Sequence, residues 1–561
     1  ESGPYPFLYH PFLYHPFLYH PPMHDSAAPT GWTRRQLFRT ARALGLGALV
    51  PGAAAAAQPV ARGAAATSPT GADLYTALGV RPIINARGTF TIIGGSVELP
   101  EVRAAKAAAN QHYANFEELM EAAGKRLAEL TGAEWGMVSS GCAAAISHAT
   151  AACVAGGNPD LHVRLPDLTG FAKTEVIIPT HSRNVYDAAV RAVGVTIVEV
   201  DTPEALALAI GPKTAMIYFF TTPRNETGPM SLEAIARIAT PHGVPIMVDA
   251  AAEILTVPNV HLQRGATLVG YSGGKILRGP QTAGLLLGRK DLVQAAWMHS
   301  APHHGYARAM KVGREEVVGM LIAVERWVKG DRAAEWAEWV RQAEVIAAAA
   351  SRVPGVTATI AREPWEDRSN RSPRVTLRWT ASQVGLTGAQ AVELLYNEEP
   401  RITVGGASGA RDGQPGDAGL TLATSMLQPG DETVVGERLR AVLSAKRTLV
   451  VPPPAAAPAG DVAGQWRVEI AFLASRSTHV LQLRQRGAVI EGSHQGDIET
   501  RELSGTMDGA KVAFTSRITE RSGNSLNYRF TGELSGDTLS GTIDMGEYRS
   551  ATWTARRVTT A

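Results

Sequence analysis

The sequence predicts a multidomain α/β protein with a mainly parallel sheet covered by helices on both faces, followed by an antiparallel β module. Short apolar stretches such as EVIIPTH, TIVEV, TAMIYFF and PIMVDAAAE alternate with helical patterns such as DAAVRAVGV and SLEAIARIATPHG. This alternation is typical of a parallel sheet between two helical layers. At 561 residues the chain is too long for one core, so two or three domains are expected.

The first residues do not belong to this fold. PFLYH occurs three times in succession between Pro6 and His20, and we interpret residues 1–22 as a tag, a cloning scar or an incorrectly assigned start. An aromatic, histidine-rich arm for a metal or a membrane is the alternative interpretation. Met23 is a plausible natural start.

Residues 23–57 have the pattern of a twin-arginine export signal. Arg34 and Arg35 are followed by Leu-Phe, a short apolar run and an Ala-x-Ala end. The apolar run is too short to span a bilayer permanently. Twin-arginine transport moves folded proteins, so a cofactor loaded in the cytoplasm could travel with the chain. Residues 58–71 are then a flexible linker.

An anion-binding loop is predicted at the start of the Ala-rich stretch VSSGCAAAISHATAACVAG, residues 138–156. A strand end, a Ser-Ser-Gly turn and a helix follow one another there. Free amides at the helix start, with the serine hydroxyls, would bind a phosphate. An ordinary helix N-cap is the alternative. The residues assigned to this loop are Ser139, Ser140, Gly141, Cys142 and Ala143.

A carboxylate and an amine close two later apolar stretches. Asp249 ends VPIMVD and is followed by small residues, including Ala251, that leave room for a flat ring. Lys275 lies in YSGGKILRGPQTAG, where Ser272 and two glycines let its amine approach a carbonyl compound; a solvated surface lysine is the alternative. Pyridoxal 5'-phosphate needs both groups, a lysine for the Schiff base and a carboxylate that keeps the pyridine nitrogen protonated. The order of phosphate loop, Asp249 and Lys275 therefore predicts a pyridoxal phosphate site.

These stretches resemble a known group of enzymes. Besides the Lys275 stretch, the likeness lies in INARGTFTIIGGSVELPEV (84–102), MEAAGKRLAELTGAEWGMVSSGCAAAI (120–146) and KVGREEVVGMLIAVERWV (311–328). The group is that around bacterial selenocysteine synthase (seryl-tRNA selenium transferase) and D-glucosaminate-6-phosphate ammonia lyase, and the lyase-like branch is the more similar. The resemblance runs from about residue 72 to about residue 447. It implies an aminotransferase-like (fold-type I) protein with Lys275 as the residue that carries the cofactor.

The resemblance also implies further cofactor contacts. In fold-type I enzymes a residue that leaves the strand corresponding to EVIIP often stacks on the cofactor ring, and that residue is His181 here. Ser182 or Arg183 could take this place instead, and a plain polar loop histidine is equally compatible with the pattern. Asn225, in the turn-rich stretch PRNETGPM, could reach the phenolic oxygen of the cofactor.

Arg87, Arg401 and His303 are candidates for substrate contacts. Arg401 lies in PRITVGG, which is expected to form one strand, at a position type where this fold often holds a carboxylate with a bidentate guanidinium. Arg378 is the alternative. Arg87 is a possible anion contact or a structural surface arginine. His303 lies in a Gly/Pro loop, which we interpret as an active-site loop, since no third ligand for a metal is evident.

The pattern changes after the region of resemblance. The expected large, pyridoxal-phosphate-binding domain covers residues 72–328, the small α+β domain 329–450, a Pro/Ala linker 451–460 and a β module 461–561. In the module, eight short alternating stretches separated by turn residues predict a closed or sandwich-like antiparallel structure. Gly464-Gln465-Trp466 resembles the G-x-W start of lipocalin-like barrels. The module is interpreted as a structural or dimer-facing part, with a ligand-binding barrel or a surface tether as alternatives.

Charge and cysteine content exclude some classes of partner. A formal charge of +2 gives no electrostatic reason to expect nucleic acid, which argues against a tRNA substrate. Cys142 and Cys153 lie eleven residues apart on one predicted helix, too far to bridge each other. No disulfide framework and no metal site is expected.

The expected function is that of an exported pyridoxal-phosphate-dependent lyase. The lyase-like resemblance implies α,β-elimination from a free amino acid or an amino sugar acid, with Lys275 as the base at Cα. Racemisation, aldol cleavage, desulfuration and transamination share the same early steps and stay open. A non-catalytic exported protein that binds a ligand in its barrel is the alternative from another class. The resemblance implies at least a homodimer, and the signal implies the periplasm or the exterior.

Overall fold

The structure is a computed structural model that describes residues 71–362, 368–369, 372–406, 417–449, 454–517 and 527–558. The chain divides into residues 1–70 and 71–561, and only the second unit is described. The PFLYH repeats, the export signal and the linker expected before residue 71 lie outside the described residues. No helix in the described ranges combines the length and the apolar character needed to cross a membrane.

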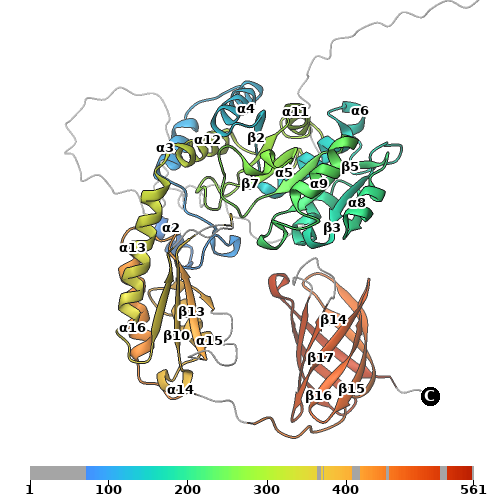
Figure 1. Ribbon diagram of the computed structural model, residues 1–561. Helices are drawn as coiled ribbons and strands as arrows, with labels where there is room; N and C mark the ends of the chain where they lie inside the picture. Colours follow the sequence, from blue (N-terminus) through green and yellow to red (C-terminus); the bar gives the residue numbers. More distant parts are fainter. Residues whose placement is uncertain are drawn as a thin grey trace, which may run out of the picture. The chain divides into compact units, whose positions relative to one another are not determined.

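A seven-stranded sheet forms the centre of the region between residues 135 and 288, in the order β2-β8-β7-β6-β5-β3-β4. The sheet is parallel, as expected, except for β8, which runs antiparallel to both of its neighbours. Nearly all positions of its inner strands are buried, because helices cover the sheet on both faces (Figure 1). The strands are β2 (Trp135–Ser139), β3 (Glu175–Pro179), β4 (Thr196–Val200), β5 (Thr214–Phe220), β6 (Ile246–Asp249), β7 (Leu268–Ser272) and β8 (Gly284–Gly288).

The central helix of this region is α5 (Cys142–Ala155), which is buried at almost every position. Most of its residues are apolar, as expected of a helix enclosed by other elements, and its buried Ser147, His148 and Thr150 are hydrogen-bonded to backbone carbonyls. The longer α4 (Phe116–Thr131) is amphipathic instead, and its first turn is capped by Asn115, whose side chain accepts from the amide of Glu118. The other helices are α3 (Pro100–Ala109), α6 (Pro159–His162), α7 (Ala188–Arg191), α8 (Pro203–Ala209), α9 (Leu232–Ala239), α10 (Val260–Gln263), α11 (Lys290–Met298) and α12 (Arg314–Lys329).

A second α/β region follows, in which α13 (Arg332–Ala350) and α16 (Asp431–Ser444) pack along one face of a four-stranded sheet (Figure 1). The sheet has the order β12-β13-β10-β9. The stretch PRITVGG, expected as one strand, forms two: β11 pairs in parallel with β1, whereas β12 joins the four-stranded sheet. The remaining bounds are β1 (Ile84–Asn85), β9 (Thr357–Ala361), β10 (Arg374–Trp379), β11 (Ile402–Thr403), β12 (Gly405–Gly406), β13 (Ala418–Ala423), α2 (Gly71–Ala77), α14 (Ala381–Val384) and α15 (Gly388–Asn397).

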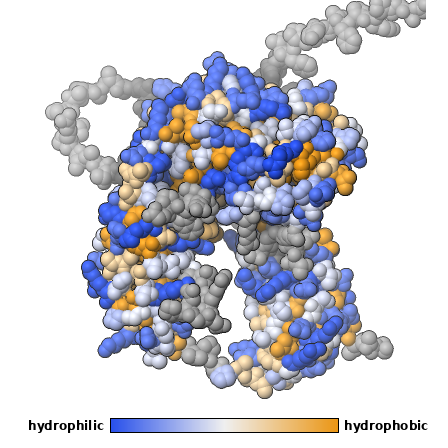
Figure 2. Space-filling model, in the orientation of Figure 1, coloured by the Kyte–Doolittle hydropathy of each residue, from blue (hydrophilic) through white to orange (hydrophobic). Residues whose placement is uncertain are grey.

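The C-terminal residues form a closed eight-stranded antiparallel barrel. Trp466 of the G-x-W stretch is fully buried, donates from its indole to the carbonyl of Val462, and is covered by the guanidinium of Arg557. Inward and outward side chains alternate, and apolar and polar residues are interspersed on the visible face of the molecule (Figure 2). The strands are β14 (Gly464–Ala471), β15 (Arg476–Arg486), β16 (Val489–Gln495), β17 (Thr500–Asp508), β18 (Lys511–Arg517), β19 (Tyr528–Ser535), β20 (Thr538–Asp544) and β21 (Ser550–Arg557).

Candidate active site

The loop between β2 and α5 has the geometry of an anion cradle. Gly141 adopts φ 91°, which a residue with a side chain rarely does, and it places the amides of the first turn of α5 without intrahelical acceptors. Ser139 donates to the carbonyl of Gly141 over 2.9 Å and so shapes the turn. A methyl group on Gly284 of β8 would lie 2.4 Å from the carbonyl carbon of Gly141, so only glycine fits beside the loop. Ser140 and Ala143 are more exposed than their buried neighbour Cys142.

Asp249 ends β6 with its carboxylate almost fully buried, at 1% exposure. Its Oδ2 accepts from the hydroxyl of Tyr218 over 2.7 Å, and its Oδ1 accepts from the amide of Ala251 over 3.1 Å. The thiol of Cys142 lies 3.6 Å from Oδ1. Burial raises the pKa of Asp249 above its ordinary value, while these hydrogen bonds and the charge of Lys275 oppose that rise.

Lys275 follows β7 in a tight loop and is half-buried. The amide of Arg278 donates to the carbonyl of Lys275 over 2.9 Å, and the amide of Gly273 donates to the carbonyl of Ala283 over 2.8 Å. The ammonium of Lys275 lowers the pKa of both Asp249 and Cys142, although burial outweighs it in both cases. The amine, the carboxylate and the start of α5 therefore belong to one site.

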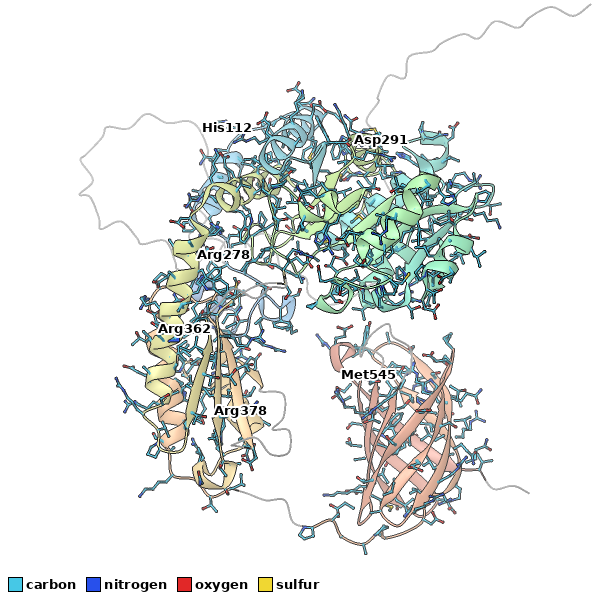
Figure 3. The ribbon with its side chains drawn as sticks, in the orientation of Figure 1. His112, Arg278, Asp291, Arg362, Arg378 and Met545 are labelled. Carbon is cyan, nitrogen blue, oxygen red and sulfur yellow. The ribbon has the colours of Figure 1, made fainter. Side chains whose placement is uncertain are left out.

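The leading segment, residues 84–99, is fastened to this lysine loop. The side-chain amide of Gln281 donates to the carbonyl of Ser96 over 2.7 Å and to the carbonyl of Gly274 over 3.2 Å. Arg278, labelled in Figure 3, donates from Nε to the carbonyl of Val97, and its own carbonyl accepts from the amide of Leu99. Arg278 has φ 52°, an uncommon value for a non-glycine residue, three positions after Lys275.

His181 and Asn225, the two further residues predicted to contact the cofactor, lie close together and are hydrogen-bonded to neighbouring backbone carbonyls. His181 is exposed, and its Nε2 lies 3.1 Å from the carbonyl of Met230. Asn225 is buried, donates to the carbonyl of Phe220 over 2.6 Å and lies 3.3 Å from Nδ1 of His181. Of the two alternatives to His181, Ser182 is buried beneath it, and Arg183 pairs with Asp187.

The predicted substrate arginines do not converge on one point. Arg401 donates from Nε to the carbonyl of Tyr396 and lies 3.9 Å from the centre of that ring. The guanidinium of Arg87 lies 4.5 Å from the centre of the Phe90 ring. Arg378 lies on β10, in the sheet of the second α/β region (Figure 3). None of these three guanidinium groups is bonded to the lysine loop in the described part of the chain.

His303 lies beside α4 and α11. Its Nε2 is 3.0 Å from Oε1 of Glu117, and its ring meets Trp297 edge-on at 5.2 Å. Among the described residues no group of three or more His, Cys, Asp or Glu side chains could hold a metal ion.

Three residues of the site were not identified from the sequence. Tyr218 lies within the apolar strand TAMIYFF, where its hydroxyl was the available signal, since a buried hydroxyl needs a partner. Gln281 and Arg278 belong to the lysine stretch itself, but their partners in the leading segment lie far away in the sequence.

The arrangement fits pyridoxal phosphate. The glycine-lined cradle at α5 suits a phosphate, and Asp249 is a buried carboxylate that lacks a cationic hydrogen-bond donor among the described residues. Lys275 supplies an amine whose charge acts on both Asp249 and Cys142. The site thus offers backbone amides for the cofactor's phosphate, a carboxylate for its ring nitrogen and an amine for its aldehyde.

Comparison with known proteins agrees with this site. A family model described as "Cys/Met metabolism PLP-dependent enzyme" matches residues 98–306. D-glucosaminate-6-phosphate ammonia lyase from Salmonella typhimurium is 34% identical over 332 residues, which cover 57% of this chain and 86% of that protein. A 5'-C-glycyluridine monooxygenase-decarboxylase from a Streptomyces species is 32% identical over 386 residues, 66% of this chain and 92% of that one.

More distant relatives and a solved structure extend the comparison. An L-seryl-tRNA(Sec) selenium transferase from Moorella thermoacetica is 30% identical over 287 residues, which span 57% of its length. A solved structure of D-glucosaminate-6-phosphate ammonia-lyase is 30% identical with a TM-score of 0.58, covering 67% of this chain and 99% of that one. The fold is therefore the aminotransferase-like fold-type I, followed by the added barrel. The chain belongs to the pyridoxal-phosphate-dependent enzymes, in the family that includes D-glucosaminate-6-phosphate ammonia lyase.

Proposed function

We propose that this enzyme catalyses α,β-elimination from a free amino acid or an amino sugar acid, releasing ammonia and a 2-oxo acid. The observation that carries the proposal is the 34% identity with an ammonia lyase over 86% of that protein's length. The site supports it, because a half-buried amine and a fully buried carboxylate lie together at the ends of β7 and β6. The relative that is named a monooxygenase-decarboxylase shows that the family also includes other reactions.

Each group of the site has a defined task in this proposal. When bound, pyridoxal phosphate supplies an electron sink for the negative charge that develops at Cα. The amides at the start of α5 bind the phosphate, and Asp249 holds a proton at the ring nitrogen. Lys275 removes the proton from Cα and delivers one to the leaving group at Cβ. The Gln281–Ser96 bond keeps the lysine loop in position against the leading segment.

The test is proton NMR in heavy water with candidate substrates that carry a leaving group at Cβ, including D-glucosaminate 6-phosphate. Elimination gives ammonia and a 2-oxo acid, and the Lys275→Ala variant gives neither. Exchange of the Cα proton without either product would reject elimination in favour of racemisation.

We further propose that the enzyme is exported by the twin-arginine route, as a small-molecule enzyme of the periplasm or the exterior. The paired Arg34 and Arg35, the short apolar run and the Ala-x-Ala end support this. Replacing both arginines with lysine should retain the enzyme in the cytoplasm with residues 33–57 uncleaved. Unchanged secretion of the double variant would contradict the proposal and make a tRNA substrate admissible again.

A homodimer is proposed as the minimum assembly. Between residues 74 and 113 several large apolar side chains are exposed, among them Leu78 at 78%, Ile92 at 87% and Tyr113 at 99%. Large apolar side chains that are exposed within one segment of the chain favour a surface that is covered by another chain. Ile92→Asp should shift the sedimentation coefficient from dimer to monomer, whereas Leu208→Asp, equally exposed at 87% on α8, should not.

A further inference from the structure

Two neighbouring strands bring a tyrosine and the buried carboxylate together beneath the site. β5 and β6 run in parallel, with Phe220 opposite Asp249, and Tyr218 points its hydroxyl across to Oδ2 over 2.7 Å. Tyr218 and Asp249 are essentially inaccessible to solvent, at 0% and 1% exposure. A hydrogen bond to an ionised acceptor in such surroundings is stronger than one at the surface.

The tyrosine is itself fixed from the other side. The side-chain amide of Asn184 donates to the Tyr218 oxygen over 3.3 Å, so the phenolic oxygen accepts one hydrogen bond and donates another. Burial, and then the charge of Asp249, raises the pKa of Tyr218, so the hydroxyl keeps the proton that it donates to Asp249. The chain of donors therefore has one direction, from Asn184 through Tyr218 to Asp249.

The other groups that face Asp249 do not replace this donor. From α5 the thiol of Cys142 lies 3.6 Å from Oδ1, and a thiol is a weak donor. The amide of Ala251 also serves Oδ1. From the loop after β7, Lys275 acts through its charge alone. Tyr218 is thus the donor that serves Oδ2 among the described residues.

We propose that Tyr218 is a positioning residue, whose hydroxyl orients the Asp249 carboxylate and keeps it ionised so that it can hold the ring nitrogen of the cofactor. Tyr218 acts through Asp249 and does not itself contact the reacting atoms. The inference rests on cofactor binding and is independent of whether the reaction is elimination.

Removal of the Tyr218 hydroxyl should change the pH dependence of cofactor binding. An ionised Asp249 is needed to pair with a protonated ring, so cofactor affinity falls as the pH drops through the pKa of Asp249. Burial raises that pKa, and the Tyr218 hydrogen bond lowers it. Without the hydroxyl the carboxylate takes up its proton at a higher pH. Tyr218→Phe should therefore move the acid limb of cofactor binding upward by roughly one to two pH units, the range for a hydrogen bond to a charged group.

The experiment measures the dissociation constant of pyridoxal phosphate for the full chain at several pH values, by titration of the cofactor-free enzyme. Tyr271→Phe is the matched control: Tyr271 is a buried tyrosine on the adjacent β7, and its hydroxyl accepts from Asn259 rather than donating to Asp249. The titration of the cofactor's own groups is common to all variants, so the difference between them reports Asp249.

A second readout does not involve the cofactor. In the infrared spectrum of the cofactor-free enzyme, the protonated carboxyl band that Asp249→Asn abolishes should appear at a higher pH in Tyr218→Phe than in the unaltered enzyme. If Tyr218→Phe does not fold, Asn184→Ser takes its place, because it removes the donor to the Tyr218 oxygen and retains an oxygen to cap the amide of Tyr186.

The outcomes separate clearly. An upward shift of the acid limb in Tyr218→Phe, with none in Tyr271→Phe, supports the assignment even if no elimination is found. If cofactor binding weakens at the same pH in Tyr218→Phe and in the unaltered enzyme, the assignment is overturned. Equal shifts in both tyrosine variants overturn it too, since they would reflect a general loosening of the core.

Discussion

Gln281 and Ser96 lie 185 positions apart in the sequence, yet the side-chain amide of Gln281 donates to the carbonyl of Ser96 over 2.7 Å. The same amide donates to the carbonyl of Gly274, the residue before Lys275. One side chain thus connects the leading segment to the peptide that carries the amine. Space for it exists because Gly95 and Gly274 have no side chain where Gln281 lies.

Removal of this connection should impair turnover more than folding. Gln281→Ala frees the lysine loop, and small displacements of a catalytic group reduce rates by roughly ten- to a hundredfold. Steady-state kinetics should show a lower kcat, while the thermal midpoint changes little. Thr282→Ala, at the neighbouring exposed position, is the control. A kcat equal to that of the unaltered enzyme would show that the loop holds its position without Gln281.

A methyl group beside the anion cradle should weaken cofactor binding. In Gly284→Ala the new carbon would lie 2.4 Å from the carbonyl carbon of Gly141, so the loop or β8 must shift, at a cost of about 1–3 kcal/mol. Equilibrium dialysis should show a higher dissociation constant for pyridoxal phosphate. Gly211→Ala, where nothing lies within 4 Å of the added carbon, should leave it unchanged. Equal affinity in the two variants would argue against the cradle.

Lys275 should be the point of covalent attachment. Borohydride reduction of the holoenzyme should add the mass of the reduced cofactor to the peptide that contains Lys275, as measured by mass spectrometry. Lys275→Ala should lose this adduct, because Lys275 is the cation that acts on both Asp249 and Cys142, the first residue of α5. Lys290→Ala, a lysine stacked on Trp135, should retain it. An adduct that persists in Lys275→Ala would place the cofactor elsewhere.

Buried histidines should make the protein sensitive to acid. Burial lowers the pKa of His299 and of His494 to about 3, and that of His148 to about 4. These groups stay neutral in the folded chain but take up protons in the unfolded chain below a pKa of about 6.5, so stability falls as the pH drops below that value. Each of these histidines lowers the free energy of unfolding by up to about 2 kcal/mol between pH 6.5 and pH 5.

Substitution of one such histidine should reduce this loss. Nδ1 of His494 lies 2.8 Å from the hydroxyl of Ser516, and its Nε2 lies 2.8 Å from Nδ1 of His479 within the barrel. Glutamine keeps a donor and an acceptor at this position but does not titrate. Urea unfolding at pH 7 and pH 5 should show a smaller difference for His494→Gln than for the unaltered chain. The exposed His242→Gln should leave the difference as it was. The same pH dependence in both variants would mean that His494 does not titrate on unfolding.

Local order along the chain was sufficient to predict much of this protein. Each of Gly141, Asp249 and Lys275 comes at or just after the end of a buried strand, and strand ends on one edge of a parallel sheet meet at one site. The period-2 alternation after residue 461 likewise predicted the antiparallel barrel, since each strand pairs with the next one along the chain. Both patterns depend on neighbours in sequence, so they are visible in the sequence.

The tertiary structure decided which distant side chains meet. Tyr218 and Asp249 are 31 positions apart, and only the pairing of β5 with β6 brings the hydroxyl to the carboxylate. His303 and Glu117 are 186 positions apart in the sequence, and only the fold brings the imidazole to within 3.0 Å of that carboxylate. Likewise PRITVGG has the composition of one strand, but its two halves find partners in two different sheets. Composition sets the tendency to pair, whereas the partner depends on which backbone lies alongside, and that is a property of the whole fold.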